Sequence, residues 1–301
     1  MKTLEYWLAR FVLWSVAWCP PLARVYVKVL DLAIPRWRRA AVRNLEIAGI
    51  GDAGNPDAVD PDVVDPDVID QDVIIDGMYR SIARMLETFA RFPSMNRENI
   101  GQWIRYDGLE HFQNALASGR GVLVATGHLG NWELSAFAHA LMTAPMDVVV
   151  RSLDNPRVDG LVERQRALSG NHIISKRDAA REILRALKSG RAVGILVDQN
   201  TVIEEGVFVD FFGTAACAGS AFVKIAHHSG AAVVPGYALW SEGERRYLLR
   251  FDPEIPMSGD VREDTQRIHG HLESVIREYP DQYLWIHKRW KTRPPGGAAL
   301  Y

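Results

Sequence analysis

The sequence reads Val122-Leu-Val-Ala-Thr-Gly-His128-Leu-Gly-Asn-Trp-Glu133-Leu134 across an expected strand, turn and helix start. The apolar first part is typical of a buried β-strand, and residues 131–141 have the pattern of a helix. His128 therefore falls in the turn after the strand, and Glu133 falls in the first helical turn. A carboxylate there can fold back onto the imidazole, fix its tautomer and stabilise its protonated form. The pattern predicts a general base with an orienting acid.

Glycines on either side of His128 support this interpretation. Gly127 and Gly130 permit backbone dihedral angles that other residues rarely adopt, and they leave N–H groups exposed near the helix start. Because negative charge is stabilised there, the backbone around Gly130 and Asn131 is a candidate oxyanion site. The alternative is that His128 only caps the helix or makes a core hydrogen bond, with Glu133 as an unrelated surface acid.

Strands and helices alternate along most of the chain. We expect further strands at 147–151, 172–175, 192–197, 232–239 and 247–251, and helices at 77–92, 108–118, 157–169, 177–188, 218–229 and 262–278. This alternation predicts an α/β fold with a mostly parallel central sheet flanked by helices. Ligands bind at the carboxyl ends of strands in such sheets. His128, Arg151 and Asp198 all fall at or after strand ends, so we expect them to converge.

Nucleophilic side chains of the usual hydrolase kinds are poorly placed in this sequence. No Gly-x-Ser-x-Gly elbow occurs, and Cys217 has no basic neighbour in sequence to lower its pKa. This leaves direct attack by a substrate hydroxyl, with His128 removing its proton. An acyl thioester suits such a reaction because a thiolate leaves readily. The oxyanion then needs N–H groups around Gly130 or a cation such as Arg166.

Other polar residues after the expected strands are candidates for substrate binding. Arg151 and Arg166 can hold an acidic sugar lipid or the phosphate of phosphopantetheine, because guanidinium binds phosphate in a bidentate manner. Their alternative role is a surface salt bridge. Asp198-Gln199-Asn200 can anchor active-site loops or position an arginine, or it can simply end a strand.

The Gly-His-Leu-Gly-Asn-Trp-Glu string resembles the His-x4-Asp/Glu motif of the glycerolipid acyltransferases, and in particular the lauroyl and myristoyl acyltransferases of lipid A. The resemblance extends over residues 100–294 in the family's order. It is carried by Arg151-Ser-Leu-Asp-Asn155-Pro, Arg166, Gly194-Ile-Leu-Val-Asp198-Gln-Asn200, Val209-Asp-Phe-Phe-Gly213 and Trp285-Ile-His-Lys-Arg-Trp-Lys-Thr-Arg-Pro294. Residues 49–77 depart from the family.

The resemblance implies a glycerolipid-acyltransferase-like fold and a membrane-associated O-acyltransferase. Its substrates would be an acyl thioester, carried by acyl carrier protein or coenzyme A, and a glycolipid such as a lipid A precursor. No cofactor and no acyl-enzyme intermediate are expected. Rival interpretations are an acyltransferase for a phosphatidylinositol mannoside or a lysophospholipid, a non-catalytic lipid-binding relative, and a thioesterase or phospholipase in which water replaces the acceptor.

Composition fits one globular unit in a reducing compartment. The chain has 301 residues, 48% hydrophobic and 24% charged, with a net charge of −2, so bulk electrostatics indicates no nucleic-acid partner. Two cysteines, Cys19 and Cys217, allow no disulfide framework or zinc cluster. His227-His228 and His269-x-His271 lack a third ligand, so we expect no metal site.

The N-terminal residues 1–48 are basic, apolar and rich in tryptophan. Residues 1–43 contain eight Lys and Arg against Glu5 and Asp31, a net charge of +6. The apolar run Tyr6–Cys19 is shorter than the ~20 residues needed to cross a bilayer. We expect amphipathic helices that lie on an anionic leaflet, at the cytoplasmic face of the inner membrane. The alternative is helices packed on the protein's own core.

Residues 49–77 contain a repeat of five residues with proline and aspartate, from Pro56 to Asp70. Proline at every fifth position forbids a continuous helix, and uncompensated aspartates favour a solvated insertion. The aspartates do not have the alternate spacing of the oxygen ligands of an EF-hand loop, and its central glycine and final glutamate are missing. We therefore expect an acidic loop, followed by an acyltransferase domain at 78–301. The C-terminal run Tyr283–Arg293 interleaves aromatic and basic residues, which suits a membrane interface or an acidic carrier protein.

Overall fold

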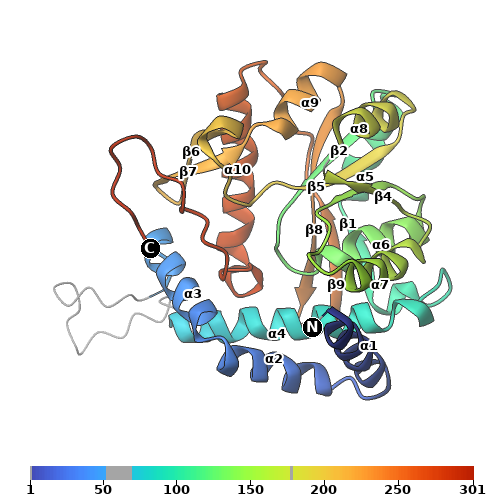
Figure 1. Cartoon of the computed structure of the whole chain (residues 1–301). Coiled ribbons are helices and arrows are strands. Elements are labelled where there is room, and N and C mark those ends of the chain that lie inside the picture. Colours follow the sequence, from blue (N-terminus) through green and yellow to red (C-terminus); the bar gives the residue numbers. More distant parts are fainter. Residues whose placement is uncertain (1, 52–69, 177–178) are drawn as a thin grey trace.

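A computed structural model describes residues 2–51, 70–176 and 179–301 and contains one central mixed sheet (Figure 1). Its strands lie in the order β1-β9-β8-β2-β5-β3-β4. All neighbours are parallel except β8 and β9, which form an antiparallel hairpin. The α/β fold with a mostly parallel sheet is confirmed. The strands are β1 (Ile104–Asp107), β2 (Val122–Thr126), β3 (Asp147–Val150), β4 (His172–Ser175), β5 (Ala192–Leu196), β8 (Ala232–Ser241) and β9 (Arg246–Phe251).

Helices cover both faces of this sheet, because the buried strands carry apolar residues on both sides. In β2, Val122 and Val124 pack toward α5 and α6, whereas Leu123 and Ala125 pack toward α8 and α9. The described helices are α1 (Lys2–Trp18), α2 (Leu22–Ala33), α3 (Pro35–Ala48), α4 (Gln71–Ala90), α5 (Leu109–Ala117), α6 (Trp132–Met142), α7 (Pro156–Ala167), α8 (Ala179–Lys188), α9 (Ala221–Ser229) and α10 (Val261–Glu278).

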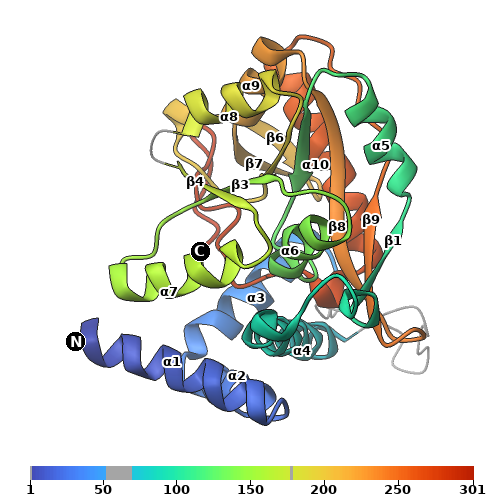
Figure 2. The same ribbon diagram turned by 90° about the vertical axis from the view of Figure 1, so that its right-hand side faces the viewer.

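The N-terminal helices α1, α2 and α3 pack around α4 below the sheet (Figures 1 and 2). Val16 and Leu45 are fully buried in this cluster, so the segment is part of the folded unit. A second face of α1 and α2 is exposed and apolar, with Trp7, Phe11 and Trp14 more than half accessible. Packing on the protein's own core, the alternative arrangement, is therefore present on the buried face, and the expected position of these helices on an anionic leaflet stays a prediction. Within the described residues, no helix has the length and apolar character to cross a bilayer.

Two local expectations were wrong. Helix α4 begins at Gln71 instead of Gly77, with the Asp70 carboxylate capping Asp72 N at 2.8 Å, so residues 71–77 are helical and not loop. The segment at 218–229 starts as a strand, since Ala218 belongs to β7 and α9 begins only at Ala221. The remaining repeat, 56–69, lies outside the described residues.

Two elements were not anticipated from sequence. Strand β1 forms the sheet edge, and a separate antiparallel hairpin is made of β6 (Gly206–Phe211) and β7 (Thr214–Gly219). The hairpin packs against α10 and the C-terminal segment, where Trp290 Nε1 donates to Thr214 O at 3.2 Å. Alanines make up much of β7, and alanine is a weak strand signal, so local propensity concealed it.

Candidate active site

His128 and Asp198 form a hydrogen-bonded pair at the carboxyl ends of adjacent strands. In the parallel pairing of β2 with β5, Thr126 lies opposite Leu196, and each functional residue follows two positions later. The imidazole Nδ1 lies 2.9 Å from Asp198 Oδ1, and the His128 backbone N–H donates to Asp198 Oδ2 at 2.9 Å. The carboxylate thus holds both the ring and the backbone of the histidine.

This contact raises the pKa of His128 and fixes the tautomer of its neutral ring. Burial opposes charge on His128, yet the charge of Asp198 and its hydrogen bond outweigh it and raise the His128 pKa. Burial would also raise the pKa of Asp198, but the imidazole and backbone donors lower it to about 2. An ionised carboxylate only accepts hydrogen bonds, so Nδ1 carries the proton and Nε2 is left as the base.

The backbone around His128 is clamped by the segment before the C-terminal signature. Leu284 N donates to His128 O at 2.9 Å, and Gly130 N donates to Gln282 O at 2.9 Å. Gly130 has a φ of 64°, and a Cβ there would lie 2.0 Å from Ala238 O, so only glycine fits. The next N–H, of Asn131, donates to the same Ala238 O at 2.8 Å. The expectation of exposed N–H groups at Gly130 and Asn131 was therefore wrong.

Glu133 lies in the first turn of α6 but does not hydrogen-bond the imidazole, contrary to expectation. Its carboxylate binds Arg166 of α7 in a bidentate manner, with Nε to Oε2 at 2.8 Å and Nη2 to Oε1 at 2.6 Å. Both side chains are mostly buried. Burial, the largest single effect, lowers the pKa of Arg166, but the hydrogen bonds and charge of Glu133, together with the nearby charges of Asp159 and Glu163, raise it overall. Glu133 still acts on His128 through space, as a smaller contribution that raises the histidine pKa.

The two asparagines proposed for the site are structural in their contacts. Asn131 is fully buried, its Oδ1 caps α6 by accepting from Leu134 N at 3.0 Å, and its Nδ2 donates to Thr88 Oγ1 at 2.7 Å. Asn200 anchors the C-terminal segment, because its Nδ2 donates to Thr292 Oγ1 at 2.9 Å and its Oδ1 accepts from Thr292 N at 3.0 Å. Both side-chain amides therefore make hydrogen bonds within the protein.

An outer, partly polar cleft joins most of the expected residues. It is lined by His128, Glu133, Arg151, Arg166, Lys176 and Gln199 together with side chains of β3, β5 and their loops. The Arg151 side chain is 80% exposed, and its one ionic partner among the described residues, the fully exposed Asp154, is 3.9 Å away. The charge of Arg151 is therefore available to solvent or to a ligand. The convergence expected for the strand ends is thus present, with Gln199 at the rim.

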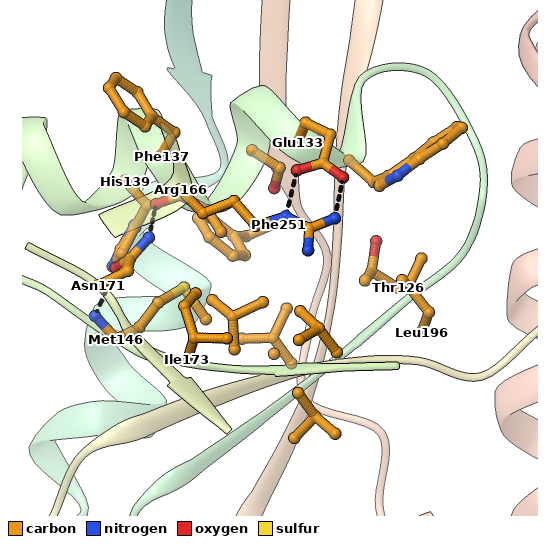
Figure 3. A pocket seen from close by; sticks show the side chains of 18 residues that line it. Thr126, Glu133, Phe137, His139, Met146, Arg166, Asn171, Ile173, Leu196 and Phe251 are labelled. Atoms are coloured by element: carbon orange, nitrogen blue, oxygen red, sulfur yellow. Dashed lines mark hydrogen bonds and ion pairs between the residues drawn. The ribbon is translucent and has the colours of Figure 1, made fainter. Parts of the chain in front are cut away.

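An inner cavity opens beside this cleft and is lined mainly by apolar side chains (Figure 3). Its walls come from β2, β3, β4, β5, β9, α6 and α7 and from the loop before β3, and the apolar lining residues include Phe137, Met146, Val148, Ile173, Leu196 and Phe251. Trp132, Glu133 and Arg166 line both the cleft and the cavity, so the ion pair stands where the two meet. His139 lies deeper, where burial lowers its pKa to about 4 and keeps it neutral.

Sequence reasoning missed the cavity and assigned the wrong acid to the histidine. Asp198 was expected only to anchor loops or to position an arginine. One feature of the sequence pointed to the contact: Asp198 lies two residues after an apolar strand, just as His128 lies two residues after β2. The pairing of β2 with β5 was the missing information.

Comparison with known proteins agrees with this geometry. The family model described as bacterial lipid A biosynthesis acyltransferase matches residues 65–292, most of the chain. The chain belongs to this family. As a member of the lipid A biosynthesis acyltransferase family, the protein is an acyltransferase. The matched residues do not include helices α1–α3.

Individual relatives of this acyltransferase carry names that agree with the family. A lipid A biosynthesis acyltransferase of Haemophilus influenzae is 26% identical over 74% of this chain and 70% of its own length. The lipid A biosynthesis lauroyltransferase of Escherichia coli is 30% identical over 67% and 66%. A phosphatidylinositol mannoside acyltransferase of Mycolicibacterium smegmatis is 26% identical over 72% of each chain.

Proposed function

We propose that this acyltransferase moves a fatty acyl chain from an acyl thioester to a hydroxyl group of a glycolipid such as a lipid A precursor. The observation that carries the proposal is a buried carboxylate on Nδ1 of a histidine that lines a polar cleft, beside an apolar cavity. A base, a site for polar headgroups and a site for a hydrocarbon chain then lie side by side.

His128 is the general base of the proposed reaction. Its Nε2 takes the proton of the acceptor hydroxyl as that oxygen attacks the thioester carbonyl. The new C–O bond forms, the C–S bond breaks, and the departing thiolate receives the proton from the imidazole. Asp198 keeps Nδ1 protonated throughout and stabilises the imidazolium between these steps, the role a carboxylate plays behind a catalytic histidine. No covalent acyl-enzyme is needed.

Arg166 is the donor we assign to the developing oxyanion. Glu133 occupies its Nε and Nη2, so the fork is held in one orientation while its Nη1 carries further N–H groups. The N–H groups of Gly130 and Asn131 are bonded to backbone carbonyls, which leaves this cation as the stronger candidate. Loss of one oxyanion donor typically costs about 2.7–4 kcal/mol of transition-state stabilisation. Arg151 and Gln199 at the rim are placed to bind polar groups of either substrate.

The inner cavity is the proposed site of the acyl chain. Its walls offer branched and aromatic side chains, and burying each methylene of a chain is worth about 0.8 kcal/mol. The thioester carbonyl would then lie at the Glu133–Arg166 pair, within the cleft that His128 lines.

The exposed apolar face of α1 and α2 supports a peripheral location at the cytoplasmic face of the inner membrane. Trp7, Trp14 and Trp18 are 56%, 60% and 79% exposed, and the guanidinium of Arg10 lies 5.2 Å from the ring centre of Trp7. Aromatic and basic side chains on one surface suit the headgroup region of an anionic leaflet. A lipid acceptor would then need to leave the bilayer only in part.

The experiment must also identify the lipid acceptor, because one relative is named for a phosphatidylinositol mannoside. The test supplies the purified protein with acyl carrier protein or coenzyme A thioesters and, in parallel, a lipid A precursor, a phosphatidylinositol mannoside and a lysophospholipid. Mass spectrometry of the products reports transfer, and free thiol reports hydrolysis. Transfer to the lipid A precursor, lost in His128→Ala, is expected. Thiol release without any acylated lipid would favour a hydrolase instead.

A further inference from the structure

A groove between α8 and α9 lies outside the site described above. Its floor is apolar, with Ile183, Phe222 and Ile225, and its rim is basic, with Lys176, Arg181 and Arg185. The helix pattern explains this division, since Ile183 faces the sheet while Arg181 and Arg185, four residues apart, share an outer face.

The basic rim is not neutralised by described carboxylates. Among the residues that the structure describes, none of Lys176, Arg181 and Arg185 has an acidic oxygen within ion-pair distance. Surface arginines elsewhere are paired, as Arg105 is with Glu244 and Arg120 with Glu254. Glu182 is the one acidic residue among the side chains that line the groove. Among the described lining residues, three basic side chains therefore stand against one acidic side chain.

The groove continues into the outer cleft. Val149, Lys176 and Ile195 line both, so a ligand in the groove lies next to the entrance used by a thioester. Helices α8 and α9 are also at the opposite end of the molecule from α1 and α2 in both views (Figures 1 and 2). A ligand here would approach from the side away from the exposed tryptophans, which favours a soluble macromolecule over a lipid surface.

We propose that this groove docks an acidic acyl carrier protein and aims its thioester into the outer cleft. The inference rests on the proposed function, because it assigns the donor of that reaction. Basic side chains at the rim would pair with carboxylates of the carrier, and the apolar floor would bury a hydrophobic residue at the centre of the contact. The acceptor lipid and the donor protein then reach the same cleft from opposite ends of the enzyme.

The test reverses the charge of the rim without touching the cleft. The double variant Arg181→Glu/Arg185→Glu is compared with Lys188→Glu/Lys224→Glu, which changes the net charge equally at exposed positions of α8 and α9 that do not line the groove. Each protein is titrated with acyl carrier protein in a direct binding assay. Each is also assayed with three donors: acyl carrier protein, coenzyme A and N-acetylcysteamine thioesters of one chain length.

We expect the groove variant to lose at least about tenfold in carrier affinity and in kcat/KM with the carrier-bound donor, because opposed like charges weaken association. Its kcat/KM with the small thioester should equal that of the unmodified protein, and the control variant should bind the carrier several-fold better than the groove variant. Equal losses for coenzyme A and carrier donors would mark a phosphate site and overturn protein docking. Unchanged carrier binding by the groove variant would show that the carrier protein does not dock in this groove. The binding arm needs no turnover, so inactivity with all donors would count against the proposed function alone.

Discussion

Asp198 Oδ1 lies 2.9 Å from Nδ1 of His128, although 70 residues separate the two in sequence. Each follows its strand by the same number of positions, and the strands are paired in register, so the sheet sets the contact. The Glu133 carboxylate, only five residues from the histidine, instead binds Arg166. The proposed general base, His128, is therefore oriented by an acid that is distant in sequence.

The first prediction concerns this acid. Asp198→Asn should lower kcat by about 10²–10⁴-fold, because the amide no longer fixes the Nδ1–H tautomer. Asp198 raises the pKa of His128, and a base works only when unprotonated, so activity should rise with pH through that raised pKa. In the variant, this rise should move to lower pH. Profiles of kcat/KM against pH check it; an unmoved profile with full activity would refute the role of Asp198.

The second prediction concerns the ion pair between cleft and cavity. Glu133→Gln and Arg166→Met should each reduce turnover by about 10²-fold or more, in the range seen for loss of an oxyanion donor. Their double variant should be little worse than either single variant, because the two residues act as a unit. A double-mutant cycle with kcat/KM measures this. The same cycle between Glu133 and His128, which share no hydrogen bond among the described contacts, should be closer to additive.

The third prediction concerns the length of the acyl chain. A Cβ on Gly194 would meet the flexible end of Met146 at 3.1 Å inside the cavity, so Gly194→Val fills space with little disturbance of the backbone. Each methylene of the donor that is excluded should cost about 0.8 kcal/mol, or about fourfold in kcat/KM. Activity with a short donor is the internal control. Competition among donors of graded length checks the result. An unchanged order of preference would mean that the acyl chain does not bind in the inner cavity.

The fourth prediction concerns the cysteines. Cys217 is buried, and burial raises the pKa of its thiol, so it is not an activated nucleophile. Cys19 is exposed and lines neither the cleft nor the cavity. Cys19→Ala and Cys217→Ala should retain activity within about twofold, as general-base transfer needs no thiol. Intact-mass measurement under excess donor should find no acyl adduct on the unmodified protein. A stoichiometric adduct lost in Cys217→Ala would require a covalent route.

The fifth prediction concerns the exposed tryptophans of α1. Replacing Trp7, Trp14 and Trp18 by serine should leave the folded protein nearly as stable, since these side chains are mostly in solvent. Binding to anionic vesicles and transfer to a vesicle-borne acceptor should fall by about tenfold or more, because interfacial binding scales with apolar area. Donor hydrolysis without acceptor should be unchanged.

A matched control keeps this experiment specific. Leu168, Val202 and Ile203 are exposed to a similar degree, at 54%, 53% and 48%, but lie on other elements. Serine at these three positions should leave sedimentation with vesicles unchanged. Equal loss of vesicle binding in both triple variants would mean that α1 has no special part in it.

Much of the fold followed from local pattern. The period of apolar residues located most helices and the buried strands, and Asn131 and Gly130 marked the turn into α6 as expected. The start of α4 was misplaced because residues 71–77 follow an acidic repeat, whose composition resembles a loop. Strand β7 was missed because it is rich in alanine, which is no strand former on its own.

The sequence by itself determined the α/β class, the position of His128 after a buried strand, the family, and a basic, tryptophan-rich beginning. Tertiary structure alone decided the strand order, and with it the acid that holds the imidazole and the cation that holds Glu133. It also decided where the apolar cavity opens, because its walls come from β2, β3, β4, β5, β9, α6 and α7. Local periodicity reports which face of an element is buried, but pairing between parallel strands depends on contacts far apart in the chain.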